Sequence, residues 1–178
     1  MCSSDLMSDW VNVDIAPGKN TTLLLDVRRP LPFTDGSVRR IFAEHVIEHL
    51  DFNEDIPQVF AEFNRVLAPG GVVRIIVPDC ERFVVAYASR NRAMWRDVGW
   101  DLDTFPEGIH TSMHVLNHMF DQEGEHLFAY DFETMEWALR RAGFKAVHKQ
   151  AFKVSVDPEL AIDLEVHKPY SLYVEAVK

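Results

Sequence analysis

The sequence predicts an α/β fold, in which a mostly parallel sheet carries helices on both faces. Two observations predict it. Short apolar runs that end at acidic residues alternate with a segment of helical periodicity. The 178 residues, 47% of them hydrophobic, are also enough to bury one ordinary core. Because ligands bind outside the carboxyl ends of the strands in such sheets, polar residues at these ends are the first candidates for a site.

Three apolar runs in the first part of the chain are predicted to be strands. Residues 10–15 (Trp-Val-Asn-Val-Asp-Ile) alternate apolar and polar side chains and then enter a turn at residues 16–18. Residues 21–26 form a continuous apolar run that stops at an aspartate, and we expect both of these strands to be buried. Residues 38–43 are the third strand, and they lead into a helical turn at residues 44–50.

A helix follows, and we expect Asn53 to cap its amino terminus. Its apolar residues recur with the 3.6-residue period of one helical face. They are Ile56, Val59, Phe60, Phe63, Val66 and Leu67. The sequence Pro69-Gly70-Gly71 ends this helix, and the β-branched run at residues 72–77 is the next predicted strand, which ends at Asp79.

The composition changes after Asp79. Residues 80–130 are rich in Trp, Phe, Met and His and are interrupted by glycine and proline, so we expect several short helices that form an insert over the site. Asp131 is expected to cap a further helix that Gly143 closes. A strand near Val147 and a last strand at residues 171–177 complete the predicted sheet.

Charge and composition limit the partners. The formal net charge of −10 repels phosphate backbones and anionic lipid, so we expect no nucleic acid and no membrane as a partner. No apolar run approaches the roughly 20 residues of a membrane span, and the first ten residues lack the pattern of a signal peptide. Cys2 and Cys80 are too few for a disulfide scaffold or a thiolate metal site. We therefore expect a cytoplasmic protein.

Several short motifs occur in a fixed order. They are Val13-Asp14, Leu25-Asp26 with Leu31-Pro32-Phe33, Glu48-His49, and Arg65 to Gly71 before a strand. In these motifs the chain resembles the class I S-adenosylmethionine-dependent methyltransferases of the compact, small-molecule, type 11-like kind, which have a Rossmann-like sheet. The resemblance implies methyl transfer from S-adenosylmethionine to a small-molecule acceptor. It also implies a single domain, 1–178, with a cofactor-binding half (10–79), a helical substrate-side insert (80–130) and a C-terminal helix with strands (131–178).

The resemblance further implies a cofactor site. Its residues are Asp14, Ile15, Asp26, Val27, Glu44 and His45. In the family, the acidic residue at the position of Asp14 holds the ribose hydroxyls, and the one at Asp26 faces the adenine amino group. Glu44 and His45 then lie beside the methionine portion. Carboxylates accept charge-assisted hydrogen bonds from hydroxyls and amines, which suits both aspartates. The alternative is that Asp14 and Asp26 only end strands as turn residues.

The catalytic residues are not fixed by this resemblance, because methyl transfer depends mainly on positioning and the exclusion of water. If the reaction needs a base, His45 and His49 are the candidates, although His49 is equally well interpreted as a packed, hydrogen-bonded histidine. The sequence from His45 to His49 also spells H-x-x-E-H, the inverted zincin motif, with Glu48 as the base. A zinc-dependent hydrolase is therefore an alternative function.

Three histidines recur every four residues, at His110, His114 and His118. On a continuous helix they would form a ladder on one face. No carboxylate or cysteine with ligand spacing accompanies them, so we interpret them as part of a substrate cover. We expect no metal site in this protein.

The family's opening strand and its glycine-rich loop have no counterpart in the sequence. The eight glycines stand at positions 18, 36, 70, 71, 99, 108, 124 and 143, so no G-x-G occurs, and residues 1–9 show no strand pattern. We therefore expect an N-terminally truncated domain in which methyl transfer is impaired. A degenerate, non-catalytic binding or interaction module is the alternative.

The opening strand is central in the family's sheet, so its absence would leave two neighbouring strands with unpaired backbone groups. Three arrangements could close the gap. The two neighbours could pair directly, residues 1–9 could act as a strand, or a second chain could pair with the exposed edge to give a homo-oligomer.

Overall fold

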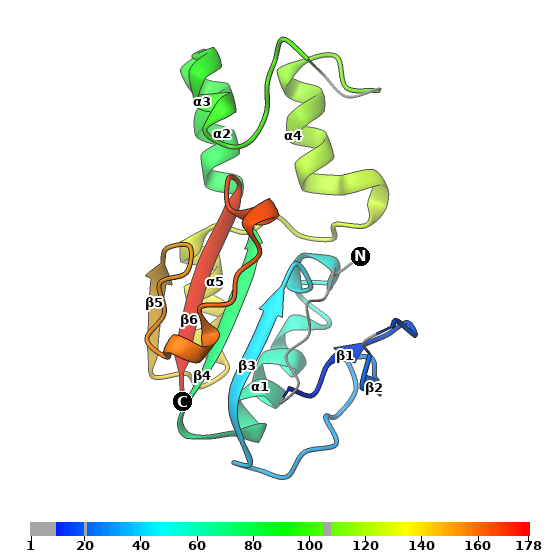
Figure 1. Cartoon of the computed structure of the whole chain (residues 1–178), viewed down its shortest axis with the longest axis vertical. Coiled ribbons are helices and arrows are strands. Elements are labelled where there is room, and N and C mark those ends of the chain that lie inside the picture. Colours follow the sequence, from blue (N-terminus) through cyan, green and yellow to red (C-terminus); the bar gives the residue numbers. More distant parts are fainter. Residues whose placement is uncertain (1–9, 20, 105–107) are drawn as a thin grey trace.

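The computed structural model describes residues 10–19, 21–104 and 108–178, and its strands form two sheets (Figure 1). In the small sheet, β1 (Val13–Asp14) pairs in parallel with β2 (Leu23–Leu24). The main sheet has the order β3-β4-β6-β5. Its strands are β3 (Val38–Glu44), β4 (Leu67–Pro78), β5 (Ala146–Gln150) and β6 (Ser171–Val177). Since β6 is antiparallel to both β4 and β5 while β3 is parallel to β4, only β6 is reversed, and the predicted mostly parallel sheet is confirmed.

Helices and irregular segments cover the two faces of the main sheet (Figure 1). The α-helices are α1 (Ile56–Val66), α2 (Cys80–Ser89), α3 (Arg92–Arg96), α4 (Ser112–Asp121) and α5 (Phe132–Arg141). The 3-10 helices are η1 (Ile47–His49), η2 (Gln122–Gly124), η3 (Pro158–Leu160) and η4 (Glu165–His167). The helices α1 and α5 pack on the face that carries Val73, Ile75 and Val77. The segment 151–170, with η3 and η4, covers the face that carries Arg74.

The predicted apolar face is confirmed for the five residues that lie on α1, all of which are buried. Leu67, the sixth, is buried too, but it is the first residue of β4. The predicted cap is wrong. Asp55, not Asn53, precedes the first residue of α1. The reason is local: one carboxylate oxygen of Asp51 accepts the backbone N–H groups of both Asn53 and Glu54 at 2.8 Å, which closes a separate turn before the helix begins.

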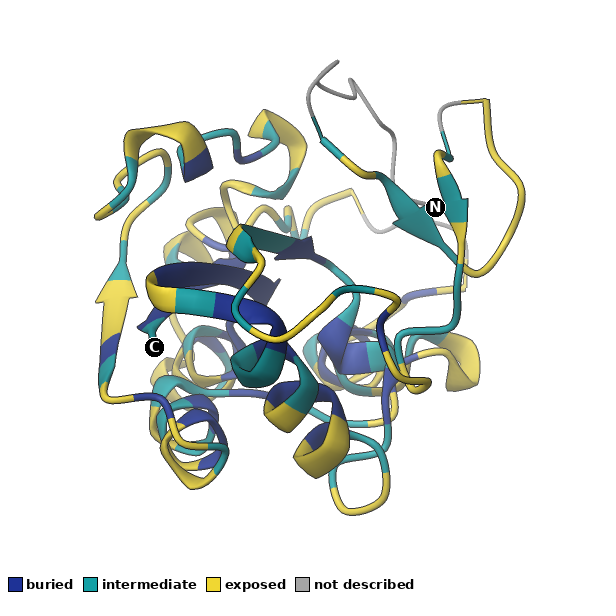
Figure 2. Cartoon of the chain, turned by 90° about the horizontal axis from the view of Figure 1, so that it is seen from below, coloured by how far each residue is buried: buried dark blue, intermediate teal, exposed yellow. Residues whose placement is uncertain are grey.

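The prediction that the first two strands are buried is also wrong. Each has only two residues, and Ile15 and Leu24 are 67% and 58% exposed. Figure 2 shows the β1–β2 pair in teal and yellow, apart from the dark blue core. The physical reason is that these strands pair only with each other within the described part of the chain, so only part of their apolar surface is covered.

The two strands expected to flank the family's opening strand, β1 and β3, belong to separate sheets in the described part of the chain. Among the described residues β1 pairs only with β2 and β3 only with β4, so direct pairing of β1 and β3, the first of the three possible arrangements, does not occur there. Residues 1–9, the second candidate, lie outside the described residues. Pairing with a second chain stays a prediction. One edge of β3 thus has no strand beside it in the described part of the structure.

The predicted insert of short helices is confirmed as α2, α3, α4 and η2. It has a small core of its own, which includes Phe83, Trp95, Val115 and Met119. The chain then returns to the sheet at α5, where the predicted cap is confirmed: Oδ1 of Asp131 accepts the backbone N–H of Thr134 at 2.8 Å.

A buried ionic cluster joins the main sheet to the segment that covers it. The side chains of Arg74 on β4, Glu175 on β6 and Asp163 are all 0% exposed. The Arg74 guanidinium donates to both carboxylate oxygens of Asp163 at 2.6 Å and to Glu175 at 2.8 Å. It also donates to the backbone oxygens of Ala151 and Val154. Every charge in the cluster therefore has an oppositely charged partner.

Candidate functional site

Asp14 and Asp26 lie at the carboxyl ends of the two strands of the small sheet, Asp14 within β1 and Asp26 just after β2. Asp14 is the last residue of β1, which is in register with β2, and the N–H of Leu25 donates to the backbone oxygen of Asp14 at 2.9 Å. Oδ1 of Asp14 accepts the N–H of Ala16 at 2.9 Å, which closes a turn. The register therefore brings these two predicted cofactor residues to one end of the same parallel pair, with Ile15 and Val27 directly after them.

The Asp26 carboxylate is engaged by a neighbouring cation. Both of its oxygens accept from the Arg28 guanidinium at 2.8 Å, and one also accepts the Arg28 backbone N–H at 3.0 Å. These hydrogen bonds hold the pKa of Asp26 below its usual range. The carboxylate is therefore ionised at neutral pH and suited to accept a hydrogen bond, but a ligand at this position competes with Arg28.

A polar pocket opens beside Asp26. Its volume is about 320 Å³, and its lining residues are Asp26, Arg28, Arg29, Asp55 and Gln58. It lies between the end of β2 and the start of α1. Its lining includes Asp26 but not Asp14, Glu44 or His45, so the pocket holds one part of the predicted site only.

Glu44 and His45 lie at the carboxyl end of β3, in the other sheet. Glu44 is 7% exposed, and its Oε1 accepts from the Leu164 N–H at 3.2 Å and contacts Nδ1 of His167 at 3.0 Å. His45 has a φ of 52°, in the left-handed region that a non-glycine residue adopts at a cost of about 1 kcal/mol or more. Its ring centroid lies 4.0 Å from that of His167.

The structure thus separates the predicted cofactor residues into two pairs. Asp14 and Asp26 end the small sheet, whereas Glu44 and His45 end β3 and are covered by the segment 164–171. Ser171 contributes to this cover, since its Oγ lies 3.1 Å from Nε2 of His45. His167 is a neighbour of this site that the sequence did not reveal, because it is about 120 residues away along the chain in no recognisable motif.

The H-x-x-E-H motif does not adopt the geometry of an inverted zincin. That motif needs both histidines on one α-helix. Within residues 44–50 the only helix is the three-residue η1, and His45 lies outside it with its left-handed backbone. The zinc-hydrolase alternative is therefore not supported by the structure. His49, instead of facing His45, has its ring 5.0 Å from that of His126.

His126 is buried beside the same segment. It is 7% exposed, and its Nδ1 lies 2.8 Å from the backbone oxygen of Met119. Burial lowers the pKa of His126, so its imidazole is neutral at pH 7. No motif in the sequence links His126 to Glu48 and His49, because their contact depends on how residues 125–128 return to the sheet.

The expected histidine ladder is also not formed. The helix α4 begins at Ser112, so His110 precedes it. Nδ1 of His114 accepts the backbone N–H of His110 at 3.2 Å, whereas His118 lies with its ring edge-on to Trp100 at 5.7 Å. The rings of His110 and His114 are also edge-on at 5.7 Å, so only His118 has a separate neighbour.

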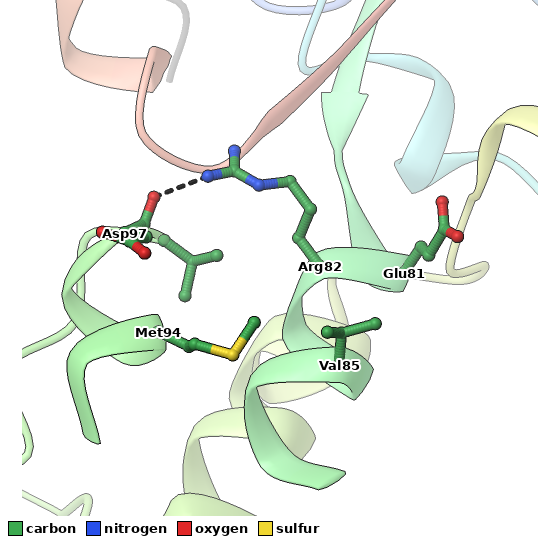
Figure 3. A pocket seen from close by; sticks show the side chains of 6 residues that line it. Glu81, Arg82, Val85, Met94 and Asp97 are labelled. Carbon is green, nitrogen blue, oxygen red and sulfur yellow. Dashed lines mark hydrogen bonds between the residues drawn. The ribbon is translucent and has the colours of Figure 1, made fainter. Parts of the chain in front are cut away.

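A second pocket, of about 240 Å³, lies inside the insert (Figure 3). Its lining residues are Glu81, Arg82, Val85, Met94, Asp97 and Val98. Figure 3 shows Arg82 reaching from α2 to the backbone of Asp97, to which it donates at 2.6 Å. The same guanidinium donates to the backbone oxygen of Pro169 at 2.7 Å. Arg82 therefore ties the insert to the segment that covers Glu44 and His45.

These features define a class of protein: an α/β domain with acidic residues at the carboxyl ends of parallel strands. Residues 10–149 match the family model described as a methyltransferase domain, and the chain belongs to this family. A comparison with curated proteins finds no match. None of the helices in the described part of the chain has the length and apolar character that crossing a bilayer requires.

Solved structures share the fold. A SAM-dependent methyltransferase from Archaeoglobus fulgidus is 16% identical with a TM-score of 0.56, and the match covers 93% of this chain and 74% of that one. An S-adenosylmethionine-dependent methyltransferase from Mesorhizobium loti is 18% identical with a TM-score of 0.52, covering 93% and 78%. A possible exported protein from Bordetella parapertussis is 13% identical with a TM-score of 0.49, and the chain spans only 43% of its length.

Proposed function

We propose that this methyltransferase domain transfers the sulfonium methyl group of S-adenosylmethionine to a small-molecule acceptor. The observation that supports the proposal most directly is the family match over residues 10–149, within which Asp14 and Asp26 lie at the carboxyl ends of two paired parallel strands. Ligands bind outside this end of the strands in open α/β sheets. The A. fulgidus and M. loti structures are of SAM-dependent methyltransferases, which supports the choice of this cofactor.

In this proposal the two aspartates bind the nucleoside. Asp14 accepts from the ribose hydroxyls, with Ile15 beside it, and Asp26 accepts from the adenine amino group, with Val27 beside it. Both carboxylates are only partly buried, so they are accessible to a ligand. To bind the cofactor, Asp26 gives up part of its contact with Arg28. The new hydrogen bond, from the adenine amino group to the carboxylate, is also charge-assisted and offsets this loss.

Glu44 and His45 are proposed to lie beside the methionine portion. The bound cofactor supplies an electrophilic methyl group, and the bond from sulfur to this carbon breaks as the acceptor's bond to it forms. The protein's task is then to align the acceptor and exclude water. His45, whose Nε2 lies 3.1 Å from Ser171 Oγ, and His49, whose Nδ1 lies 2.9 Å from the Glu125 backbone oxygen, are the proposed bases for an acceptor that carries a proton.

We also propose that cofactor binding is impaired, because the family's glycine-rich loop has no counterpart in this sequence. In these 178 residues no G-x-G supplies close backbone amides to the cofactor. The unpaired edge of β3 favours one alternative, a non-catalytic interaction module that recruits a second strand at this edge. The two functions differ in one simple observation: an interaction module gives no saturable heat when titrated with millimolar cofactor.

Substituting Asn for Asp14 or Asp26 is expected to weaken S-adenosylmethionine binding about 10-fold in each case. Asn keeps an oxygen that can close the local turn but loses the charge, and a hydrogen bond to a charged group is worth about 1.5 kcal/mol or more. Isothermal titration calorimetry measures the change. The matched control is Glu136→Gln on the surface of α5, where an acid paired with Arg140 is neutralised outside the proposed site. Equal affinities for all three variants and the wild type would reject the proposed site.

A further inference from the structure

Three potential metal ligands come together at the end of η1. Glu48 and His49 belong to η1, and His126 follows η2. One ligand atom from each side chain can be chosen so that all of them lie within 4.8 Å of one another. The backbone fixes this arrangement, since the Glu48 carbonyl accepts the N–H of Leu127 at 2.8 Å, directly after His126.

Both histidines are oriented as metal ligands usually are. Nδ1 of His49 lies 2.9 Å from the Glu125 backbone oxygen, and Nδ1 of His126 lies 2.8 Å from the Met119 backbone oxygen. A carbonyl oxygen only accepts, so each Nδ1 carries the proton and each Nε2 keeps a free lone pair. Hydrogen bonding of the other ring nitrogen to a backbone carbonyl is the common outer contact of a metal-binding histidine.

The Glu48 carboxylate is compensated only in part. Its side chain is 1% exposed, and neither oxygen has a partner with hydrogen-bond geometry among the described residues. Nδ1 of His45 approaches Oε1 to 2.8 Å, but this contact does not satisfy the second oxygen. Burying a carboxylate without partners is costly, and a bound cation removes that cost.

We propose that Glu48, His49 and His126 form a binding site for a divalent first-row transition metal of the zinc type. Imidazole nitrogens and a carboxylate oxygen suit this class of ion, and a set of three protein ligands leaves a position for water. Ligand atoms around tetrahedral zinc lie about 3.3 Å apart, so the side chains converge by about 1.5 Å or less on binding. This proposal departs from the expectation that the protein has no metal site. Its second histidine ligand is His126, whereas the inverted zincin motif would use His45.

Zinc binding to the full chain tests this proposal without cofactor or acceptor. Protein stripped with EDTA and dialysed is titrated with zinc chloride by calorimetry, and bound metal is counted by mass spectrometry after gel filtration. We expect one zinc ion per chain. His49→Gln is expected to weaken the affinity more than about 10-fold, because losing even an outer contact of a ligand costs about 10- to 100-fold. Glu48→Gln is expected to weaken it as well.

The matched control is His114→Gln, which removes a histidine of α4 outside the cluster and is expected to leave zinc affinity unchanged. Circular dichroism establishes that each variant is folded, and His49, the more exposed of the two histidines, keeps the test valid if Glu48→Gln does not fold. Less than stoichiometric zinc in the wild type would overturn the proposal. So would a folded His49→Gln variant that binds zinc as tightly as the wild type.

Discussion

Replacing Arg74 with Met is expected to lower the free energy of unfolding by about 3–5 kcal/mol, the usual cost of removing one partner of a buried ion pair. The substitution leaves the carboxylates of Asp163 and Glu175 fully buried without their cation. It also frees the backbone oxygens of Ala151 and Val154, which the guanidinium holds. Urea unfolding followed by circular dichroism measures the loss.

Arg140→Met is the matched control for this prediction. Arg140 pairs with Glu136 on the exposed surface of α5, where an ion pair contributes about 0–1 kcal/mol. A loss for Arg74→Met no larger than that of Arg140→Met would show that the buried cluster does not hold the sheet and its cover together. The prediction bears on the site as well, because the segment that Arg74 anchors continues to His167 and Ser171, which contact Glu44 and His45.

Adding a strand and a glycine-rich loop ahead of Trp10 is expected to tighten S-adenosylmethionine binding roughly 100-fold. The loop would donate two further backbone-amide hydrogen bonds to the cofactor. At about 1.5 kcal/mol each, they add about 3 kcal/mol to the binding free energy. The added strand has a place to pair, since β1 and β3 each have an edge without a partner among the described residues. Calorimetric titration of the extended and original chains gives the ratio of affinities.

The control for the extension keeps the added strand but replaces its loop glycines with valine. Side chains at these positions keep the backbone away from the cofactor, so the gain is expected to disappear. If the extended chain folds and binds no more tightly than the original, Asp14 and Asp26 are not placed to complete a cofactor site.

Much of the fold could be predicted because its signals are local. Five apolar positions of α1 and the cap at Asp131 were predicted correctly from spacing and side-chain chemistry within a few residues. Residues 10–15 and 21–26 were wrongly predicted to be buried, because an apolar run is buried only when another layer of the structure covers it. The prediction that Asn53 caps α1 was wrong because the Asp51 side chain accepts the Asn53 backbone N–H and closes a separate turn.

The candidate site was predictable only in part for the same reason. Asp14 and Asp26 were predicted as site residues because each ends a run of apolar residues, and their role stays a proposal. The contacts of His167 with Glu44 and of His126 with His49 join residues that are far apart in the chain, so no local pattern could reveal them. The condition for a histidine ladder, one continuous helix through His110, His114 and His118, is not met because α4 begins two residues after His110.

Amide hydrogen exchange with and without saturating S-adenosylmethionine tests the central claim most directly, because it reports where the cofactor binds. We expect slower exchange in residues 14–16, 26–29 and 44–46 and unchanged exchange in α5. Unchanged exchange in all three segments at millimolar cofactor, or protection confined to the insert between α2 and α4, would contradict the account.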